Sequence, residues 1–414
     1  MNKVRTLKND LAKKMQQNTN SIICLAGKNE IAVFGLHLLL EHVDKINIRI
    51  VCNSTDLGID TWQPSLLKAA RENDISVISI EDCYHLKNLI FLSLEFEKII
   101  TPSKFLNAKL FNIHFSNLPA YKGMFTSALP LLNGESEGGV TLHEIDSGID
   151  TGDIIDQIEF SISEGDNARD LYNKYLSHSK ELLAKNLAEI LKGVTTSTPQ
   201  ASIGSTYYSA KAIDYNNLDV NLVTNADQIR NQIRAYTFPE YQVPKVHGYF
   251  VNSASVQSMK SSKKPGTLVS VTATELLVST LDFDVILHRD KNSELFRSAI
   301  TNDIELAIEC TESGADINAR QGNGWTPVIV SSFNGSIDVL RIIIQNGADV
   351  NITNYKGTTP LMYAMTYYEK SGQRDLFDLL LESGAMLELY DMHQKTIRDY
   401  AIERKVLGLF SIDG

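Results

Sequence analysis

The first half of the chain alternates short apolar runs with longer stretches whose apolar residues suit a helix. Short apolar runs next to turn residues predict buried strands, and the longer stretches predict helices. The predicted strands are residues 21–26, 46–53, 76–80 and 96–100, and the predicted helices are residues 31–40 and 65–75. Strands that alternate with helices predict a parallel sheet covered on both faces, as in a Rossmann-like α/β domain.

The pattern changes beyond this region. Residues 168–192 carry apolar positions at helical spacing and end at Gly193, a plausible helix terminator, after which a polar run predicts a loop. A helix is predicted near residues 225–236, and a β-rich segment follows over residues 246–288, with a Pro-Gly turn and alternating apolar positions. These features indicate a small accessory β unit.

From residue 292 onward the sequence repeats itself. Gly-Trp-Thr-Pro at 324–327 recurs as Gly-Thr-Thr-Pro at 357–360, and Gly-Ala-Asp at 314–316 recurs at 347–349, a period of 33 residues each time. Thr396 continues the series after a four-residue insertion. The pattern resembles ankyrin repeats, in which a turn and two antiparallel helices need stacked neighbours to bury their apolar face. We expect a partial first repeat, two full repeats and a degenerate last one.

Length and composition fit this division. A chain of 414 residues exceeds what one hydrophobic core usually serves, and 43% hydrophobic with 21% charged residues is ordinary for a globular protein. We expect an α/β catalytic domain over residues 1–200, an accessory β-rich unit over 201–290 and all-α ankyrin repeats over 291–414.

Charge and hydropathy narrow the function. A formal net charge of −11 disfavours a large nucleic-acid footprint, which needs a clustered excess of Lys and Arg. Residues 1–18 are basic and amphipathic without an apolar signal-peptide run, and no later segment approaches the roughly 20 apolar residues that span a bilayer. We therefore expect a cytoplasmic protein without a nucleic-acid or membrane partner.

Cofactor signatures are scarce. The four cysteines, which lack a Cys-x-x-Cys pair, predict neither a zinc site nor a disulfide framework, and we expect no metal. The turn at Gly27 lacks the later glycines of the dinucleotide fingerprint, which leaves a nicotinamide dehydrogenase as a weak alternative.

A two-part motif carries the chemistry. Residues 111–123 read FNIHFSNLPAYKG, and residues 139–155 read GVTLHEIDSGIDTGDII. Together they resemble the folate-dependent formyltransferase family, whose members carry Asn-x-His, then Leu-Pro and aromatic-Lys-Gly, then an acidic Asp-Thr-Gly-Asp loop. By this resemblance, Asn112, His114 and Asp150 occupy the positions of the family's catalytic triad.

The residue types suit formyl transfer to an amine, which passes through a tetrahedral oxyanion and releases a proton. His114, with an ordinary imidazole pKa near 6.5, is the candidate general base. Asn112 lies two positions away on the same face of an extended strand and is suited to donate to the oxyanion. Asp150 would orient the imidazole and favour its protonated form. The other histidines, His143 among them, lack such a frame and receive no chemical role.

The resemblance also implies a folate site. In relatives the pteridine lies against the backbone of the acidic loop and of a loop before the Asn-x-His strand, which correspond here to residues 143–150 and 92–96. The candidate contacts are Ser93, Leu94, Glu95 and Asp146. For each of them the alternative is an ordinary strand end or turn.

Three segments point to the amine substrate. Residues 27–33, 62–70 and 207–218 resemble sugar N-formyltransferases rather than methionyl-tRNA formyltransferases. Residues 233–244 then place aromatic side chains among prolines next to arginines, which suits stacking on a base and contact with a diphosphate. The candidate substrate-binding residues are Lys122, Arg230, Arg234, Tyr236, Phe238 and Tyr241. The alternatives are core packing for the aromatic residues and solvation for Lys122.

Trp325 stands out in the repeats. Thr358 occupies its place in the next repeat, in a turn that normally faces solvent. Trp325 marks a second ligand or partner surface, or else it packs against the accessory unit.

These features predict a formyltransferase that uses 10-formyltetrahydrofolate and a dTDP-linked amino-dideoxy sugar, leaning toward 3-amino-3,6-dideoxyhexose, for lipopolysaccharide O-antigen synthesis. The resemblance implies a homodimer. Two alternatives stay open: methionyl-tRNA formylation, and a non-catalytic protein that binds partners through its ankyrin repeats.

Overall fold

The computed structural model describes residues 21–410, and the basic segment 1–18 lies outside them. The chain divides into two compact units between Asn216 and Asn217. The boundaries expected near residues 200 and 290 stay a prediction. Within the described part of the chain, none of the helices combines the length and the apolar character needed to cross a bilayer.

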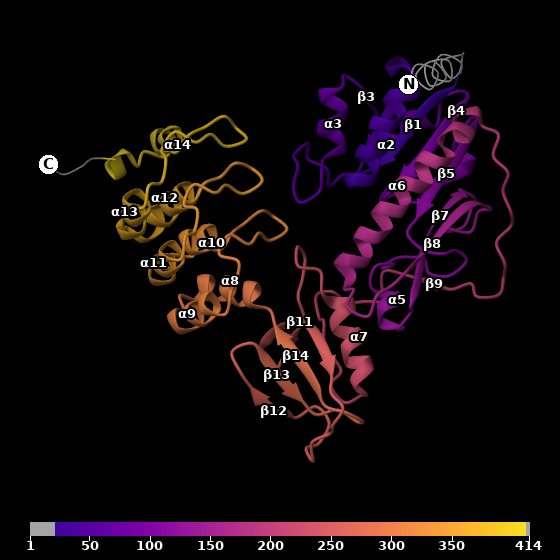
Figure 1. The fold of residues 1–414 in the computed structure, drawn as a ribbon. Coiled ribbons are helices and arrows are strands. Elements are labelled where there is room, and N and C mark those ends of the chain that lie inside the picture. Colours follow the sequence, from indigo (N-terminus) through magenta and orange to yellow (C-terminus); the bar gives the residue numbers. More distant parts are fainter. Residues whose placement is uncertain (1–20, 411–414) are drawn as a thin grey trace, which may run out of the picture. The chain divides into compact units, whose positions relative to one another are not determined.

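The first unit is built on a sheet of seven strands in the order β3-β2-β1-β4-β5-β7-β8 (Figure 1). Strands β1 to β5 run parallel, β7 is antiparallel to β5, and β8 is antiparallel to β7. Their bounds are β1 Ile22–Gly27, β2 Ile48–Cys52, β3 Ser76–Val77, β4 Leu89–Leu94, β5 Ala108–His114, β7 Glu137–Glu144 and β8 Ile154–Ser161. A separate ladder pairs β6 (Lys122–Gly123) with β9 (Tyr207–Tyr208). The Rossmann-like α/β class is confirmed.

Helices cover this sheet. Their bounds are α2 Asn29–His42, α3 Leu66–Glu72, α4 Ile80–Cys83, α5 Leu129–Leu132 and α6 Ala168–Lys192. The long helix α6 packs against β7, β8 and α2. It ends where Gly193 adopts a left-handed conformation with φ of 62°, as its sequence predicts.

Two sequence predictions need correction here. Residues 96–100 are not a strand: the strand is β4, whose six residues are all buried, and Ile99 beyond it is 74% exposed. An unbroken apolar run is typical of a strand buried on both faces, and Leu89–Leu94 is such a run. The strand expected over residues 76–80 is shorter, because Ser79 caps a helix that begins at Ile80.

The second unit begins with an antiparallel sheet in the order β10-β11-β14-β13-β12, on which helix α7 (Ala226–Tyr236) packs through contacts with β11 and β14. The strand bounds are β10 Lys245–Val246, β11 Tyr249–Val256, β12 Leu268–Val271, β13 Glu275–Val278 and β14 Val285–Arg289. Both the predicted helix and the predicted β-rich segment are confirmed.

The helix pairs α8–α9, α10–α11 and α12–α13 follow directly, and α14 comes after them with a 3₁₀ turn in place of a second helix in the described residues. Their bounds are α8 Lys291–Thr301, α9 Ile304–Glu312, α10 Pro327–Asn334, α11 Ile337–Gln345, α12 Pro360–Ser371, α13 Asp375–Glu382 and α14 Ile397–Arg404, with a 3₁₀ turn at Leu407–Phe410. The repeated threonines Thr326, Thr359 and Thr396 each cap a helix by accepting a hydrogen bond from the N–H three residues on. The first repeat has both of its helices and is not partial.

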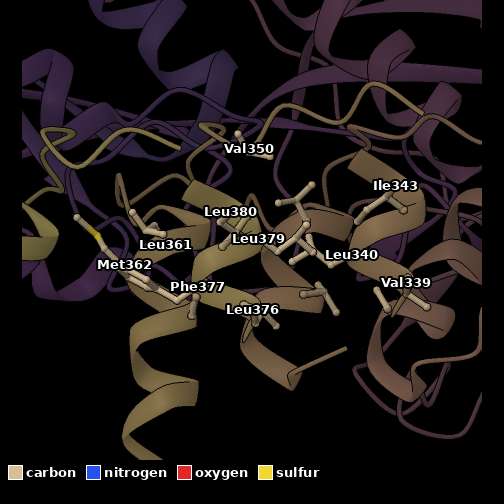
Figure 2. Close-up of a cluster of buried hydrophobic side chains, with 14 of the residues drawn as sticks. Val339, Leu340, Ile343, Val350, Leu361, Met362, Leu376, Phe377, Leu379 and Leu380 are labelled. Carbon is tan, nitrogen blue, oxygen red and sulfur yellow. The ribbon is translucent and has the colours of Figure 1, made fainter. Parts of the chain in front are cut away.

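Stacking of the repeats builds one continuous core. Side chains of α11, α12 and α13 meet in it, among them Ile343, Leu361 and Phe377 (Figure 2). Burial across neighbouring repeats supplies the stability that a single helix pair lacks. The ankyrin prediction is confirmed.

Candidate active site

The carboxyl end of β5 carries Asn112 and His114, whose side chains share a face because alternate residues of a strand do so. The loop between β7 and β8 brings Asp150 to them, with its Oδ2 atom 3.6 Å from His114 Nδ1. All three residues line a pocket of about 680 Å³ in the first unit. The structure thus brings together the three side chains that the motif singles out.

The His114 ring is held in one tautomer. Its Nε2 atom lies 2.9 Å from the backbone oxygen of Tyr121, and because a carbonyl oxygen can only accept, Nε2 carries a proton. The basic nitrogen of the neutral ring is therefore Nδ1, which faces the Asp150 carboxylate. The Tyr121 carbonyl thus fixes the ring orientation that the sequence attributes to Asp150.

Asp150 is itself anchored at both its side chain and its backbone. Its Oδ2 atom accepts a hydrogen bond of 2.9 Å from the Gly123 amide, and its backbone oxygen accepts one of 2.8 Å from the side chain of Gln200. Gln200 also donates to the Gly152 carbonyl. The polar segment after α6 therefore helps to position the acidic loop.

The residues proposed to contact folate fall into two groups. Ser93, Glu95 and Asp146 line the pocket. Leu94 is fully buried, and its backbone oxygen accepts a hydrogen bond from Lys28. The side chain of Leu94 therefore lies in the core, and its backbone oxygen already has a hydrogen-bond donor. Residues 92–94 are the end of strand β4 and not part of the loop that the sequence suggests.

Glu95 has an unusual environment at the pocket wall. Its carboxyl oxygens lie 3.1 Å from the Tyr172 hydroxyl and 3.5 Å from the Asn29 amide nitrogen. Burial raises the pKa of Glu95 to about 7, although these hydrogen bonds and Lys28 act against it. The native state therefore holds a proton on Glu95 between pH 4.5, the ordinary value, and about pH 7.

Glu95→Gln is expected to raise the free energy of unfolding of the first unit at pH 8 by on the order of 1–3 kcal/mol. The ionised carboxylate destabilises the native state above its raised pKa, and glutamine removes that cost. The gain should shrink between pH 7 and 4.5 and vanish below, where both states are protonated. Denaturant unfolding at pH 4 and 8 on a Trp325→Phe background, in which Trp62 is the single tryptophan, measures this gain by fluorescence.

Glu97→Gln supplies a matched control with the opposite sign. A hydrogen bond from the Ser54 amide lowers the pKa of Glu97, which is exposed on the same loop. This carboxylate contributes stability that is complete above its unfolded pKa and is lost as the pH falls through its lower folded pKa, so its replacement should cost stability at pH 8 and less at pH 4. The same pH trend for both variants would contradict the role of burial at Glu95.

The residues proposed to bind the nucleotide sugar, Lys122 apart, belong to the second unit. Arg230, Arg234 and Tyr236 belong to α7 in the second unit, and Phe238 and Tyr241 follow it with ring centroids 4.9 Å apart. Tyr241 is 65% exposed, whereas Phe238 is buried. None of these five is among the lining residues found within the described part of the chain. Their substrate role stays a prediction.

Lys122 is buried, with 8% of its surface exposed, and its ammonium donates a hydrogen bond of 3.1 Å to the Ser205 hydroxyl. The alternative of a solvated lysine is therefore wrong. The pocket instead contains Lys28 and Lys98, which the sequence reading did not select. Both ammonium groups suit an anionic part of a ligand.

Trp325 packs inside the ankyrin array. Its ring centroid lies 5.2 Å from that of Phe333 and 4.9 Å from that of Tyr363, and it joins the edge of the repeat core. These neighbours within the repeats supply packing expected of a large aromatic residue, and packing against the accessory unit stays a prediction. A ligand role for Trp325 stays a prediction.

Sequence reasoning missed His143. It lies on β7 directly opposite Asn112, and it lines the pocket with the three motif residues. The available signal was its position seven residues before Asp150 in a strand-like segment, but that spacing has no meaning until the antiparallel pairing of β5 and β7 is known.

Comparisons with known proteins agree with this architecture. Residues 85–187 match the formyl transferase family, and residues 295–391 match ankyrin repeats in three copies. A Staphylococcus epidermidis methionyl-tRNA formyltransferase is 31% identical over 250 residues, which cover 56% of this chain and 73% of the relative.

Two solved structures are more similar in sequence. The N-formyltransferase from Helicobacter canadensis, in complex with folinic acid and dTDP-3-aminofucose, is 41% identical, with a TM-score of 0.60 over 64% of this chain and 98% of that one. WlaRD, a sugar 3N-formyl transferase solved in the presence of dTDP and 5-N-formyl-THF, is 39% identical, with a TM-score of 0.61 over 66% and 98%.

The sheet topology and these matches define a one-carbon transferase, and the chain belongs to the formyltransferase family. It is a formyltransferase with ankyrin repeats on its C-terminal side, related to sugar N-formyltransferases and to methionyl-tRNA formyltransferases. The alternative of a non-catalytic binding protein is therefore wrong.

Proposed function

We propose that the protein transfers a formyl group from 10-formyltetrahydrofolate to the amine of a dTDP-linked amino-dideoxy sugar, with a 3-amino-3,6-dideoxyhexose as the preferred acceptor. The observation that carries this proposal is the 41% identity to a relative whose structure contains folinic acid and dTDP-3-aminofucose. The similarity extends over 98% of that relative, so it includes more than the formyl transferase match alone.

The pocket is suited to both ligands. Its volume of about 680 Å³ lies within the usual range for small-molecule sites. Phe96, Ile99 and Ile145 give one part of the lining an apolar character that fits a flat heteroaromatic ring, while Lys28 and Lys98 supply positive charge for a diphosphate. The folate contacts proposed for Ser93, Glu95 and Asp146 are compatible with their place in this lining.

The geometry of the three motif residues supports the chemistry that we propose for them. The neutral amine attacks the formyl carbon, and Asn112 donates a hydrogen bond to the oxygen that becomes negative. His114 Nδ1 accepts the proton that the nitrogen loses as its new bond forms, and Asp150 stabilises the resulting imidazolium. The bond between the formyl carbon and the folate nitrogen then breaks, and the proton on His114 is available to that nitrogen.

A panel assay tests the acceptor. The purified protein is incubated with 10-formyltetrahydrofolate and with dTDP-3-amino or dTDP-4-amino sugars, and the mass gain of one formyl group is measured. We expect faster formylation of the 3-amino sugar. Formylation of the 4-amino sugar alone would contradict the preferred acceptor, and formylation of neither would contradict the nucleotide-sugar assignment.

Methionyl-tRNA formylation is the second candidate, favoured by the Staphylococcus epidermidis relative. The net charge of −11 is against it, because a tRNA backbone is bound through clustered positive charge. Formylation of methionyl-tRNA at a rate comparable to that of the amino sugar would support this candidate instead.

Three further assignments complete the proposal. The product would enter lipopolysaccharide O-antigen synthesis, the protein would act in the cytoplasm as a homodimer, and the repeats around Trp325 would offer a second ligand or partner surface. Sedimentation of the purified chain measures its oligomeric state.

A further inference from the structure

The side chain of His143 lies against Asn112 in the wall of the pocket. The two residues face each other across the β5–β7 ladder, and Asn112 Nδ2 is 3.0 Å from His143 Nε2. His143 is 2% exposed, so the protein has removed its imidazole from solvent while placing it among the reacting groups.

The hydrogen-bond directions follow from the partners. His143 Nδ1 lies 2.7 Å from the backbone oxygen of Glu144, which can only accept, so Nδ1 carries the proton. Nε2 of the neutral ring is then an acceptor, and it takes a hydrogen bond from the Asn112 amide nitrogen. One N–H of that amide is thereby engaged, and the second N–H of the same nitrogen remains available to donate to a ligand in the pocket.

The same arrangement selects one orientation of the Asn112 amide. In the flipped orientation the Asn112 oxygen would face the lone pair of His143 Nε2, and two acceptors would meet in a buried site. An Asn112 side chain that presented its oxygen to the developing oxyanion would repel it. His143 thus distinguishes the donating orientation from the inhibitory one.

The charge state of His143 fits an acceptor role. Burial and the nearby His114 lower the pKa of His143 to about 4, against the opposing effects of Asp150, Asp146 and the Glu144 carbonyl. The ring therefore stays neutral near pH 7, and Asp150, whose Oδ1 atom is 3.7 Å from Nε2, remains a counter-ion for His114 alone.

We propose that His143 is a positioning residue that holds the Asn112 carboxamide with its nitrogen toward the reacting oxygen. It acts through Asn112 and touches neither substrate in this role. The inference rests on the proposed function of Asn112 as the donor to the oxyanion.

Kinetics of His143 variants test the proposal. His143→Leu removes the acceptor at similar volume, and we expect kcat to fall about 10- to 100-fold, since loss of a complete oxyanion donor costs about 10²- to 10³-fold, with KM for both substrates nearly unchanged. His143→Gln offers an amide oxygen near the position of Nε2 and should recover most of the loss. His85→Leu, at an exposed histidine outside the pocket, should leave kcat unchanged.

A double-mutant cycle separates positioning from a structural role. On an Asn112→Ala background, His143→Leu should lower kcat by less than about twofold, because the side chain that it positions is already absent. An equally large loss on both backgrounds would overturn the proposal, as would an unchanged kcat in folded His143→Leu. Melting temperatures establish that each variant folds.

Nitrogen-15 NMR of labelled histidine gives a readout that does not depend on turnover. We expect an unprotonated Nε2 for His143 at pH 7, assigned by its absence from the His143→Gln spectrum, and a shift of that signal when Asn112 is replaced by alanine. A protonated Nε2 at pH 7 would overturn the proposal even if turnover is normal. If the wild type formylates no amino sugar but the NMR result holds, the acceptor assignment fails and the positioning contact stands.

Discussion

Replacement of His114 by alanine is expected to lower kcat by about 10²- to 10⁴-fold, the usual range for a general base. The Tyr121 carbonyl occupies Nε2, so the ring offers Nδ1 as its proton acceptor, and Asp150 stabilises the proton there. Without the imidazole the attacking amine must lose its proton to water. KM for both substrates should change little, because the proposed role is in proton transfer and not in ground-state binding.

Fixed-time assays with saturating 10-formyltetrahydrofolate and amino sugar measure this loss of kcat. His85→Ala is the matched control, because His85 is exposed and lies outside the pocket. Partial recovery of the His114→Ala rate by added imidazole would support a proton-transfer role. A kcat within a few-fold of wild type would contradict the assignment of His114 as general base.

Much of the fold follows from local pattern. The helix at Ala168–Lys192 was predictable because its apolar spacing and the glycine after it agree, and the repeats were predictable because Thr326 and Thr359 recur with a regular period as helix caps. The strand at β4 was predicted in the wrong place, at residues 96–100. An unbroken apolar run such as β4 has no alternation of apolar and polar residues, so its position could not be taken from such a pattern.

The site was predictable where it is encoded within one strand and one loop. Asn112 and His114 share a face through the two-residue period of a strand, and the motif after them places Asp150. His143 was not predictable, since its partnership with Asn112 depends on the register between β5 and β7. The contact of His114 with the Tyr121 carbonyl could not be predicted for a different reason. Backbone contacts do not depend on side-chain type, so the sequence carries no sign of them.

The cluster of buried charged residues between the accessory sheet and the first ankyrin helices could not be predicted from the sequence either. Glu294 is fully buried, yet its place in a helix with other polar residues reads as a surface glutamate. It accepts a two-fold hydrogen bond from Arg289 at the end of β14, at 3.1 and 2.6 Å, and one of 2.9 Å from Lys291. Glu309 of α9 contacts the same two cations at 2.7 and 2.6 Å.

Glu294→Gln is therefore expected to lower the free energy of unfolding of the second unit by about 3–5 kcal/mol, the usual cost of leaving a buried ion pair incomplete. The change preserves shape but removes the negative charge, so that Arg289 and Lys291, which are 7% and 8% exposed, share the carboxylate of Glu309 alone. Desolvated cations with one counter-charge cost more than the same cations fully paired.

Urea unfolding of a Trp62→Phe background measures this effect, because that change leaves Trp325 as the chain's single tryptophan and its fluorescence reports on the repeats. Glu312→Gln is the matched control, an exposed glutamate at the end of α9 whose loss should change stability by less than about 0.5 kcal/mol. Equal stabilities of the two variants would show that Arg289 and Lys291 do not need the buried carboxylate. A large cost confined to Glu294→Gln would mean that this charge cluster joins the sheet to the repeats, since its members come from β14, α8 and α9.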